Sequence, residues 1–247
     1  MIDIQTHFVF PTHAVGPAGP LPANGETWSL TTPDGTVLKG IHFPPLDAKP
    51  GSNLVLGFGG NGWNGQDVAE YLHNLYPGDH VVAFHYRGYR PSTGTPSATA
   101  LIEDAPLVYD EAIKRLKPNK VFAAGFSIGS GIAAQLSAQR RLDGVVLVTP
   151  FDSLKSVAQS FYPWLPIATF FHHEIDSASP LEASKAPAAI IAGARDEIVA
   201  AERTDALRKR IPNIVFDRTI AGAGHNDIYS RSDFQTAMKE ALDTLGG

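Results

Sequence analysis

The chain contains no cysteine. This absence excludes disulfides, zinc sites with thiolate ligands and a cysteine nucleophile. The lack of cysteine is compatible with a reducing compartment. Residues 1–10 also lack the basic region and the long apolar run of a signal peptide. We therefore expect a cytoplasmic protein.

Charged residues are scarce, at 18% of the 247 positions, and the formal net charge is −5. Binding to a phosphate backbone needs clustered Lys and Arg side chains. The longest basic cluster, residues 208–210, falls at the end of a predicted helix, where cations complement the helix dipole. No nucleic-acid partner is expected.

Long apolar runs are also missing. A membrane-spanning helix needs about 20 apolar residues in succession, and no stretch of the chain approaches that length, so no membrane span is expected. The hydrophobic content of 43% is nevertheless enough for one sizeable core. We expect a single domain over residues 1–247.

From residue 53 onward, short apolar stretches alternate with stretches of helical periodicity. Such alternation predicts βαβ units, that is, a mostly parallel twisted sheet with helices on both faces. Strands are expected at 53–58, 80–85, 120–124, 144–148, 188–192 and 213–220, and helices at 66–75, 99–116, 127–138, 200–210 and 232–245.

Two further features lie outside this rhythm. Residues 28–31 and 37–43 alternate around Pro33-Asp34-Gly35, which predicts an antiparallel hairpin at the sheet edge, preceded by a loop over residues 11–25. Residues 151–187 form a long stretch interrupted by prolines, which predicts a cap-like insertion because long irregular insertions are often binding loops. Its aromatic residues are candidates for lining a substrate pocket, or else pack the insertion on the sheet: Phe161, Tyr162, Trp164, Phe170 and Phe171.

The strongest motif is Gly125-Phe126-Ser127-Ile128-Gly129, between a predicted strand and a predicted helix. A serine at such a sharp turn presents its hydroxyl above the sheet, and the flanking positions must be small because strand and helix nearly touch there. Ser127 is the candidate nucleophile.

The other two members of a catalytic triad follow in the order Ser, Asp, His, which α/β-hydrolases use. Asp196 lies in the loop after the predicted strand 188–192, where parallel sheets collect their functional groups. Glu197 is expected to point toward the following helix, and Asp152 is the rival acid. His225, in a glycine-rich loop after the predicted strand 213–220, is the candidate base.

An oxyanion hole needs two backbone N–H donors. One is expected from Ile128, which follows the nucleophile. The other is expected from the glycine-rich loop 59–62, with Asn61 first and Gly60 second.

A metal site is not expected. His172 and His173 are adjacent, and adjacent residues on a helix point to different sides, so they are a poor metal pair. No motif for calcium, zinc or a nucleotide is present, and no cofactor is expected. His85 ends a predicted strand and is a further candidate for lining the pocket.

Together these residues resemble the α/β-hydrolase superfamily, over almost the whole chain from residue 27 onward. Tyr86-Arg87-Gly88-Tyr89, the run 149–154 (Thr-Pro-Phe-Asp-Ser-Leu) and the run 222–227 (Gly-Ala-Gly-His-Asn-Asp) are similar to one lid-poor branch. That branch includes protein depalmitoylases and lysophospholipid lipases, and usually has His-Gly where this chain has Gly59-Gly60. The resemblance implies the same triad and the same oxyanion donors.

The function expected from these residues is cleavage of a small-molecule carboxylic ester or thioester through a Ser-His-Asp triad and an acyl-enzyme. An aminopeptidase or amidase on the same triad is one alternative. A non-catalytic ligand-binding protein of hydrolase fold is another. The acyl chain length and the oligomeric state stay open.

Overall fold

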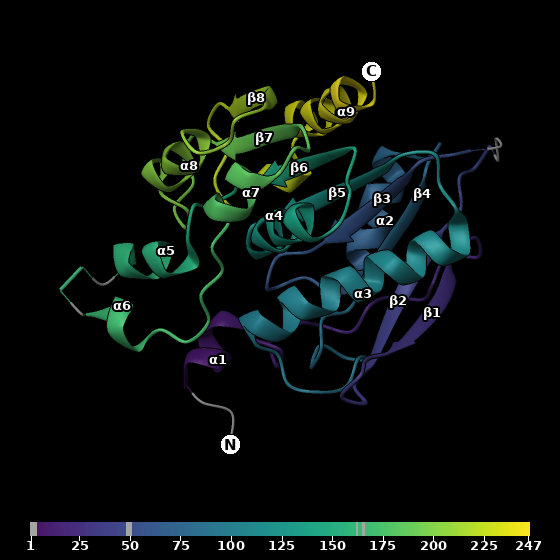
Figure 1. Cartoon of the computed structure of the whole chain (residues 1–247), viewed down its shortest axis with the longest axis horizontal. Coiled ribbons are helices and arrows are strands. Elements are labelled where there is room, and N and C mark those ends of the chain that lie inside the picture. The colour runs from purple at the N-terminus through teal and green to yellow at the C-terminus, as the bar shows by residue number, and fades with distance from the viewer. Residues whose placement is uncertain (1–3, 48–50, 162, 165) are drawn as a thin grey trace.

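The computed structural model describes residues 4–47, 51–161, 163–164 and 166–247. Within them, eight strands form one sheet in the order β1-β2-β4-β3-β5-β6-β7-β8 (Figure 1). The strands are β1 (Glu26–Thr31), β2 (Val37–Phe43), β3 (Leu54–Phe58), β4 (His80–Phe84), β5 (Val121–Phe126), β6 (Gly144–Val148), β7 (Ala188–Gly193) and β8 (Ile214–Ile220).

The pairing of the strands confirms the expected fold class. β1 and β2 form an antiparallel hairpin, β2 is antiparallel to β4, and all pairs from β4 to β8 are parallel. The hairpin turns at Gly35, whose φ of 86° lies in the region that favours glycine. Every residue of β3, β5 and β6 is buried, as expected of parallel strands covered on both faces.

Helices cover both faces of the sheet (Figure 1). Buried residues of α2 and α9 join one core cluster, and those of α3, α4, α7 and α8 join the other. These helices are α2 (Gly65–Leu75), α3 (Ala98–Leu116), α4 (Ile128–Gln139), α7 (Ala178–Ala183), α8 (Ala201–Arg208) and α9 (Ser232–Gly246). Among the described residues, none of the helices is both long and apolar enough to cross a membrane.

The segment between β6 and β7 contains more helix than its proline-rich sequence indicates. It forms α5 (Leu154–Phe161) and α6 (Ile167–Phe170) before α7. In Figure 1, α5 and α6 lie away from the sheet, on the side where α4 begins. His172 and His173 are not on a helix, because α6 ends at Phe170 and no helix is formed again before α7.

The sequence patterns give no indication of α1 (Ile4–Val9), a short helix at the start of the described chain. It has six residues, with neither a run of good helix formers nor an acidic first turn. A helix this short is marginal alone, so its order depends on contacts with distant parts of the chain. Those contacts are with the segment around α6, and they bear on the site described next.

Candidate active site

Ser127 lies at the turn from β5 to α4, with φ 52° and ψ −117°. Because this conformation is not helical, α4 begins at Ile128, one residue later than the sequence pattern suggests, and β5 continues to Phe126. A non-glycine residue at positive φ costs about 1–3 kcal/mol and persists where the surroundings impose it. Here the Ser127 N–H donates to the Val148 carbonyl at 2.9 Å, which holds the turn on the neighbouring strand.

The two glycines of the motif are required by close backbone approach. A Cβ on Gly125 would overlap the backbone oxygen of Gly129, and a Cβ on Gly129 would overlap the backbone oxygen of Phe58. Larger residues at these positions would push α4 away from the sheet. The spacing of the motif is therefore a steric consequence of the turn that presents Ser127.

Three side chains predicted from separate parts of the sequence lie in one line. His225 Nε2 is 3.0 Å from Ser127 Oγ, and His225 Nδ1 is 2.8 and 3.0 Å from the two carboxylate oxygens of Asp196. A carboxylate can only accept, so Nδ1 carries the imidazole proton and Nε2 is free to accept from the Ser127 hydroxyl. The side chains of His225 and Asp196 are 8% and 6% exposed, which keeps bulk water from competing for this pair.

Asp196 is fixed by the start of the loop after β7. Its Oδ1 accepts from the backbone N–H groups of Ile198 at 2.9 Å and Val199 at 2.7 Å. These bonds hold the carboxylate toward the imidazole. The rival acid, Asp152, instead pairs with Arg203 of α8 at 3.3 Å.

The loop that carries His225 is held by two further carboxylates. Glu197 Oε2 accepts from the His225 backbone N–H at 3.1 Å, and Asp227 Oδ1 accepts from the Gly224 N–H at 2.6 Å. Glu197 thus points back to the histidine loop, and the expectation that it faces the following helix is wrong. Asp196 binds the ring of His225, and the adjacent Glu197 binds the backbone of the same histidine.

The loop after β3 passes next to the nucleophile. A Cβ built on Gly60 would be 3.7 Å from Ser127 Cβ, and Ile128 begins α4, so its N–H has no acceptor within the helix. Gly60 therefore adjoins Ser127. The large cavity described below is lined by Asn61 and Ile128 but not by Gly60.

Two tyrosines from the loop after β4 bond the carbonyls of loop 59–61. This role was not predicted from the sequence. Tyr86 Oη donates to the Gly59 carbonyl at 2.8 Å, and Tyr89 Oη donates to the Asn61 carbonyl at 2.9 Å. Burial raises the pKa of both hydroxyls well above the usual tyrosine range, so both remain protonated donors. Both tyrosines belong to the Tyr-Arg-Gly-Tyr motif that supports the family resemblance, but only the fold shows that their hydroxyls bond loop 59–61.

A large apolar cavity of about 910 Å³ opens beside Ile128. Its walls come from α1, α5, α6 and the loop after β7. The only polar side chains in the described lining are those of Gln5 and Asn61; the other lining residues are Ile4, Phe8, Val9, Ile128, Phe151, Leu154, Val157, Ala158, Phe161, Pro166, Ile167, Phe170, Phe171, Ile198 and Val199.

The aromatic insertion contributes to this cavity, though not through every candidate. Phe161, Phe170 and Phe171 line it. Trp164 does not: its side chain is 75% exposed and lies between α5 and α6, where it faces outward. Tyr162 lies outside the described residues.

His85 does not line this cavity either. Its side chain is 3% exposed, and its Nδ1 accepts from the Gly65 N–H at 3.2 Å, at the start of α2. Burial lowers the pKa of His85 to about 4, so the ring is neutral in this structural role. No group of three or more metal-ligating side chains occurs within the described part of the chain.

Comparison with known proteins identifies the family of the fold. Residues 54–174 match the family model of the α/β-hydrolase fold. An uncharacterized protein of Mycobacterium tuberculosis is 31% identical over 220 residues, which cover 85% of this chain and 78% of that protein. The chain belongs to the α/β-hydrolase family.

Other similar proteins match this chain over different lengths. The lysophosphatidylserine lipase ABHD12 of Mus musculus is 35% identical over 128 residues, 48% of this chain and 31% of the lipase. The esterase structure from Pyrococcus furiosus superposes with a TM-score of 0.75 at 21% identity, covering 94% of this chain and 96% of that one. An α/β-hydrolase from Vibrio vulnificus gives the same TM-score at 18% identity, covering 97% and 91%. These two structures show the shared fold.

Proposed function

We propose that this α/β-hydrolase cleaves carboxylic esters, with thioesters as the chemically nearest alternative, through an acyl-enzyme on Ser127. The observation that carries the proposal is the line Ser127–His225–Asp196 beside an apolar cavity. A serine hydroxyl within hydrogen-bonding distance of an imidazole that a carboxylate orients is the arrangement for nucleophilic acyl transfer.

The first half of the reaction acylates the enzyme. His225 Nε2 takes the proton as Ser127 Oγ attacks the carbonyl carbon, and the C–O bond to the alcohol breaks when the imidazolium returns that proton to the leaving oxygen. Asp196 stabilises the imidazolium and keeps Nδ1 protonated. In the second half, water takes the place of the alcohol, and its attack releases the acid and regenerates Ser127.

The negative oxygen formed in each half needs donors. We assign these to the backbone N–H groups of Ile128 and Asn61, because both residues border the cavity next to Ser127. Tyr86 and Tyr89 donate to the carbonyls of Gly59 and Asn61 in the same loop. They therefore act as positioning residues for the Asn61 donor.

The relatives add support of a more general kind. The Pyrococcus furiosus protein is called an esterase and the ABHD12 proteins are called lysophosphatidylserine lipases. Both names describe hydrolysis of esters. The cavity lining of this chain, with its apolar side chains, suits an ester whose acyl part is apolar.

The proposal is tested by hydrolysis of an aryl ester with a short acyl chain. We expect Ser127→Ala to lose at least about 10⁴-fold in kcat while keeping the far-UV circular dichroism of the wild type. Ser232→Ala, at an exposed serine at the start of α9, is the matched control and should retain full activity. Equal rates for the Ser127→Ala and wild-type proteins would rule out the assignment, and an inactive wild type would favour a ligand-binding protein.

A further inference from the structure

The short helix α1 forms one side of the large cavity. Four of its six residues line the cavity: Ile4, Gln5, Phe8 and Val9. Ile4 and Phe8, four residues apart, lie on one face of the helix. Their side chains are 76% and 77% exposed, an unusual state for large apolar residues that border a cavity.

One glutamine fastens α1 to the segment around α6. Gln5 Nε2 donates to the Phe170 carbonyl at 2.7 Å, and Gln5 Oε1 accepts from the His172 N–H at 3.0 Å. Both ends of the amide are therefore bonded to backbone more than 160 residues away in the chain. Such a bond pair fixes the separation of α1 and α6, which bounds the width of the cavity between them.

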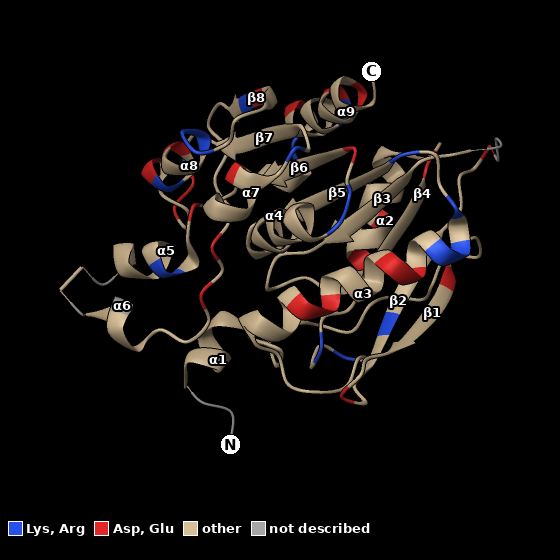
Figure 2. Ribbon diagram, in the orientation of Figure 1, with Lys and Arg blue, Asp and Glu red and all other residues tan. Residues whose placement is uncertain are grey.

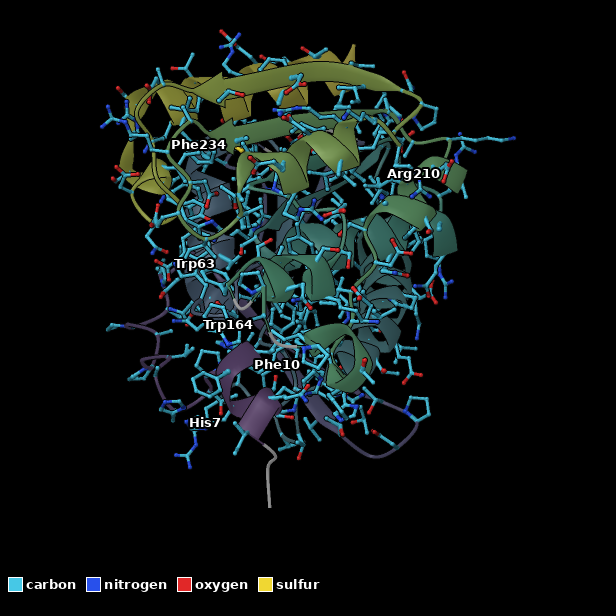
Figure 3. All side chains as sticks on the ribbon, turned by 90° about the vertical axis from the view of Figure 1, so that its left-hand side faces the viewer. His7, Phe10, Trp63, Trp164, Arg210 and Phe234 are labelled. Carbon is cyan, nitrogen blue, oxygen red and sulfur yellow. The ribbon has the colours of Figure 1, made fainter. Side chains whose placement is uncertain are left out.

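A second contact lies one residue further on. Thr6 Oγ1 and His173 Nε2 are 2.7 Å apart and buried, and the ring of Phe10 packs edge-on against His173, with centroids 5.2 Å apart. Figure 3 shows α1 with Phe10 at its end, next to the green ribbon of the insertion. We call the contacts of Gln5 and Thr6 with residues 170–173 the α1 clamp.

The other end of α1 is bonded to the loop that carries the proposed oxyanion donor. Asn61 Nδ2 donates to the Val9 carbonyl at 3.0 Å. The helix therefore extends from the α1 clamp to the neighbourhood of Ser127. An acyl chain whose carbonyl carbon is at Ser127 would run along the helix toward Ile4 and Phe8.

The chemistry of this wall selects the occupant. α1 and α6 contain no Lys, Arg, Asp or Glu, and both helices are entirely tan in Figure 2. The one cation on α5, Lys155, is 3.6 Å from Glu174. The Gln5 amide is already bonded through both its polar atoms, so the wall offers an incoming chain hydrocarbon surface and little else.

We propose that α1 is the specificity-determining wall of this enzyme, and that the α1 clamp holds it where it selects esters of long acyl chains. This inference rests on the proposed function. Short acyl groups would occupy only the end of the cavity near Ser127, whereas longer chains would reach Ile4 and Phe8 and would cover these exposed side chains. Each methylene buried against the wall should raise kcat/KM by about fourfold.

The test is a series of p-nitrophenyl esters from acetate to laurate, each below the concentration at which it aggregates. For the wild type we expect kcat/KM to rise steeply with chain length. Gln5→Ala/Thr6→Val, which removes the clamp, should lower the laurate-to-acetate ratio of kcat/KM by about tenfold or more. Gln139→Ala, at an exposed glutamine at the end of α4, is the control and should keep the wild-type profile.

A second variant covers the case in which the clamp variant does not fold. Phe8→Ala removes an exposed side chain and should flatten the same profile. A wild-type enzyme with a flat profile, or variants whose profiles run parallel to that of the wild type, would overturn the role of α1 and leave ester hydrolysis intact. An inactive wild type would instead be a failure of the proposed function.

Discussion

Glu197 accepts a hydrogen bond from the backbone N–H of His225, while the adjacent Asp196 binds the ring of the same histidine. Two neighbouring carboxylates thus hold one residue, one through its backbone and one through its side chain. We expect Glu197→Ala to lower kcat/KM for an aryl ester by about tenfold, since a hydrogen bond to a charged group contributes about 1.5 kcal/mol or more. Glu197→Gln retains an acceptor oxygen and should lose less than about threefold. If both variants lose equally, the charge of Glu197 matters and not its bond to the loop.

The two candidate acids can be separated by a pair of amide substitutions. Asp196→Asn should lower kcat by about 10³- to 10⁴-fold, because an amide in place of the carboxylate favours the wrong imidazole tautomer. Asp152→Asn weakens the contact with Arg203 and should stay within about threefold of the wild type. Steady-state kinetics of the two variants decide between them, and a larger loss at Asp152 would reverse the assignment.

The tyrosines behind loop 59–61 should affect turnover more than substrate affinity. Tyr89→Phe leaves the partly buried Asn61 carbonyl without its donor, and we expect kcat to fall about tenfold or more with a smaller change in KM. Tyr109→Phe is the matched control, because the Tyr109 hydroxyl bonds the Arg141 carbonyl at an exposed position. A Tyr89→Phe enzyme with unchanged kcat would show that the hydroxyl does not position the donor.

A buried ion pair should dominate the stability of the loop that supplies these tyrosines. Arg87 donates to both oxygens of Asp104 at 2.8 and 2.5 Å, and the two side chains are 11% and 9% exposed. Burial raises the pKa of Asp104 even beside the guanidinium, so a lone carboxylate there would be costly. We expect Arg87→Met to lower the free energy of unfolding by about 3–5 kcal/mol.

Two variants make that measurement specific, each read by urea denaturation. Arg87→Met/Asp104→Leu removes both charges and should recover much of the loss. Arg140→Met breaks an exposed pair with Asp110 and should cost about 1 kcal/mol or less. Equal losses in Arg87→Met and Arg140→Met would contradict the importance of burial.

His85 should make the fold less stable in mild acid. Burial lowers its pKa to about 4, below the value of about 6.5 for histidine in an unfolded chain. The unfolded state therefore binds the proton first, so the stabilisation is complete above about pH 6.5 and is lost as the pH falls toward 4. His85→Asn should show a dependence of unfolding free energy on pH that is weaker by about 2–3 kcal/mol between pH 7 and 4.5. Identical pH dependence in both proteins would contradict this.

Local rules were sufficient for most of the sheet and for the turn at Ser127. Buried parallel strands read as short apolar runs, and the motif 125–129 is set by steric contacts between adjacent elements, so both are visible in a single sequence. The chain order of Ser127, Asp196 and His225 was likewise readable, because each follows a strand whose end lies at the same sheet edge.

Features that depend on distant contacts were not predictable. α1 is too short to form alone and is held by backbone groups at residues 170–172. The orientation of Glu197 depends on a loop 28 residues later in the chain. The apolar cavity arises only when α1, α5 and α6 meet, so aromatic content alone could not tell which aromatic residues line it. Phe161 and Phe170 do line the cavity, whereas Trp164 is exposed outside it.

Ser127 is proposed to be an activated nucleophile, and covalent labelling tests this most directly. Purified wild-type protein and Ser127→Ala should be incubated with a fluorophosphonate probe and read by intact mass, with Ser232→Ala as the control. We expect one adduct on the wild type and on Ser232→Ala, lying on the peptide that contains residue 127, and none on Ser127→Ala. An adduct that persists in Ser127→Ala would place the reactive group elsewhere and contradict the claim.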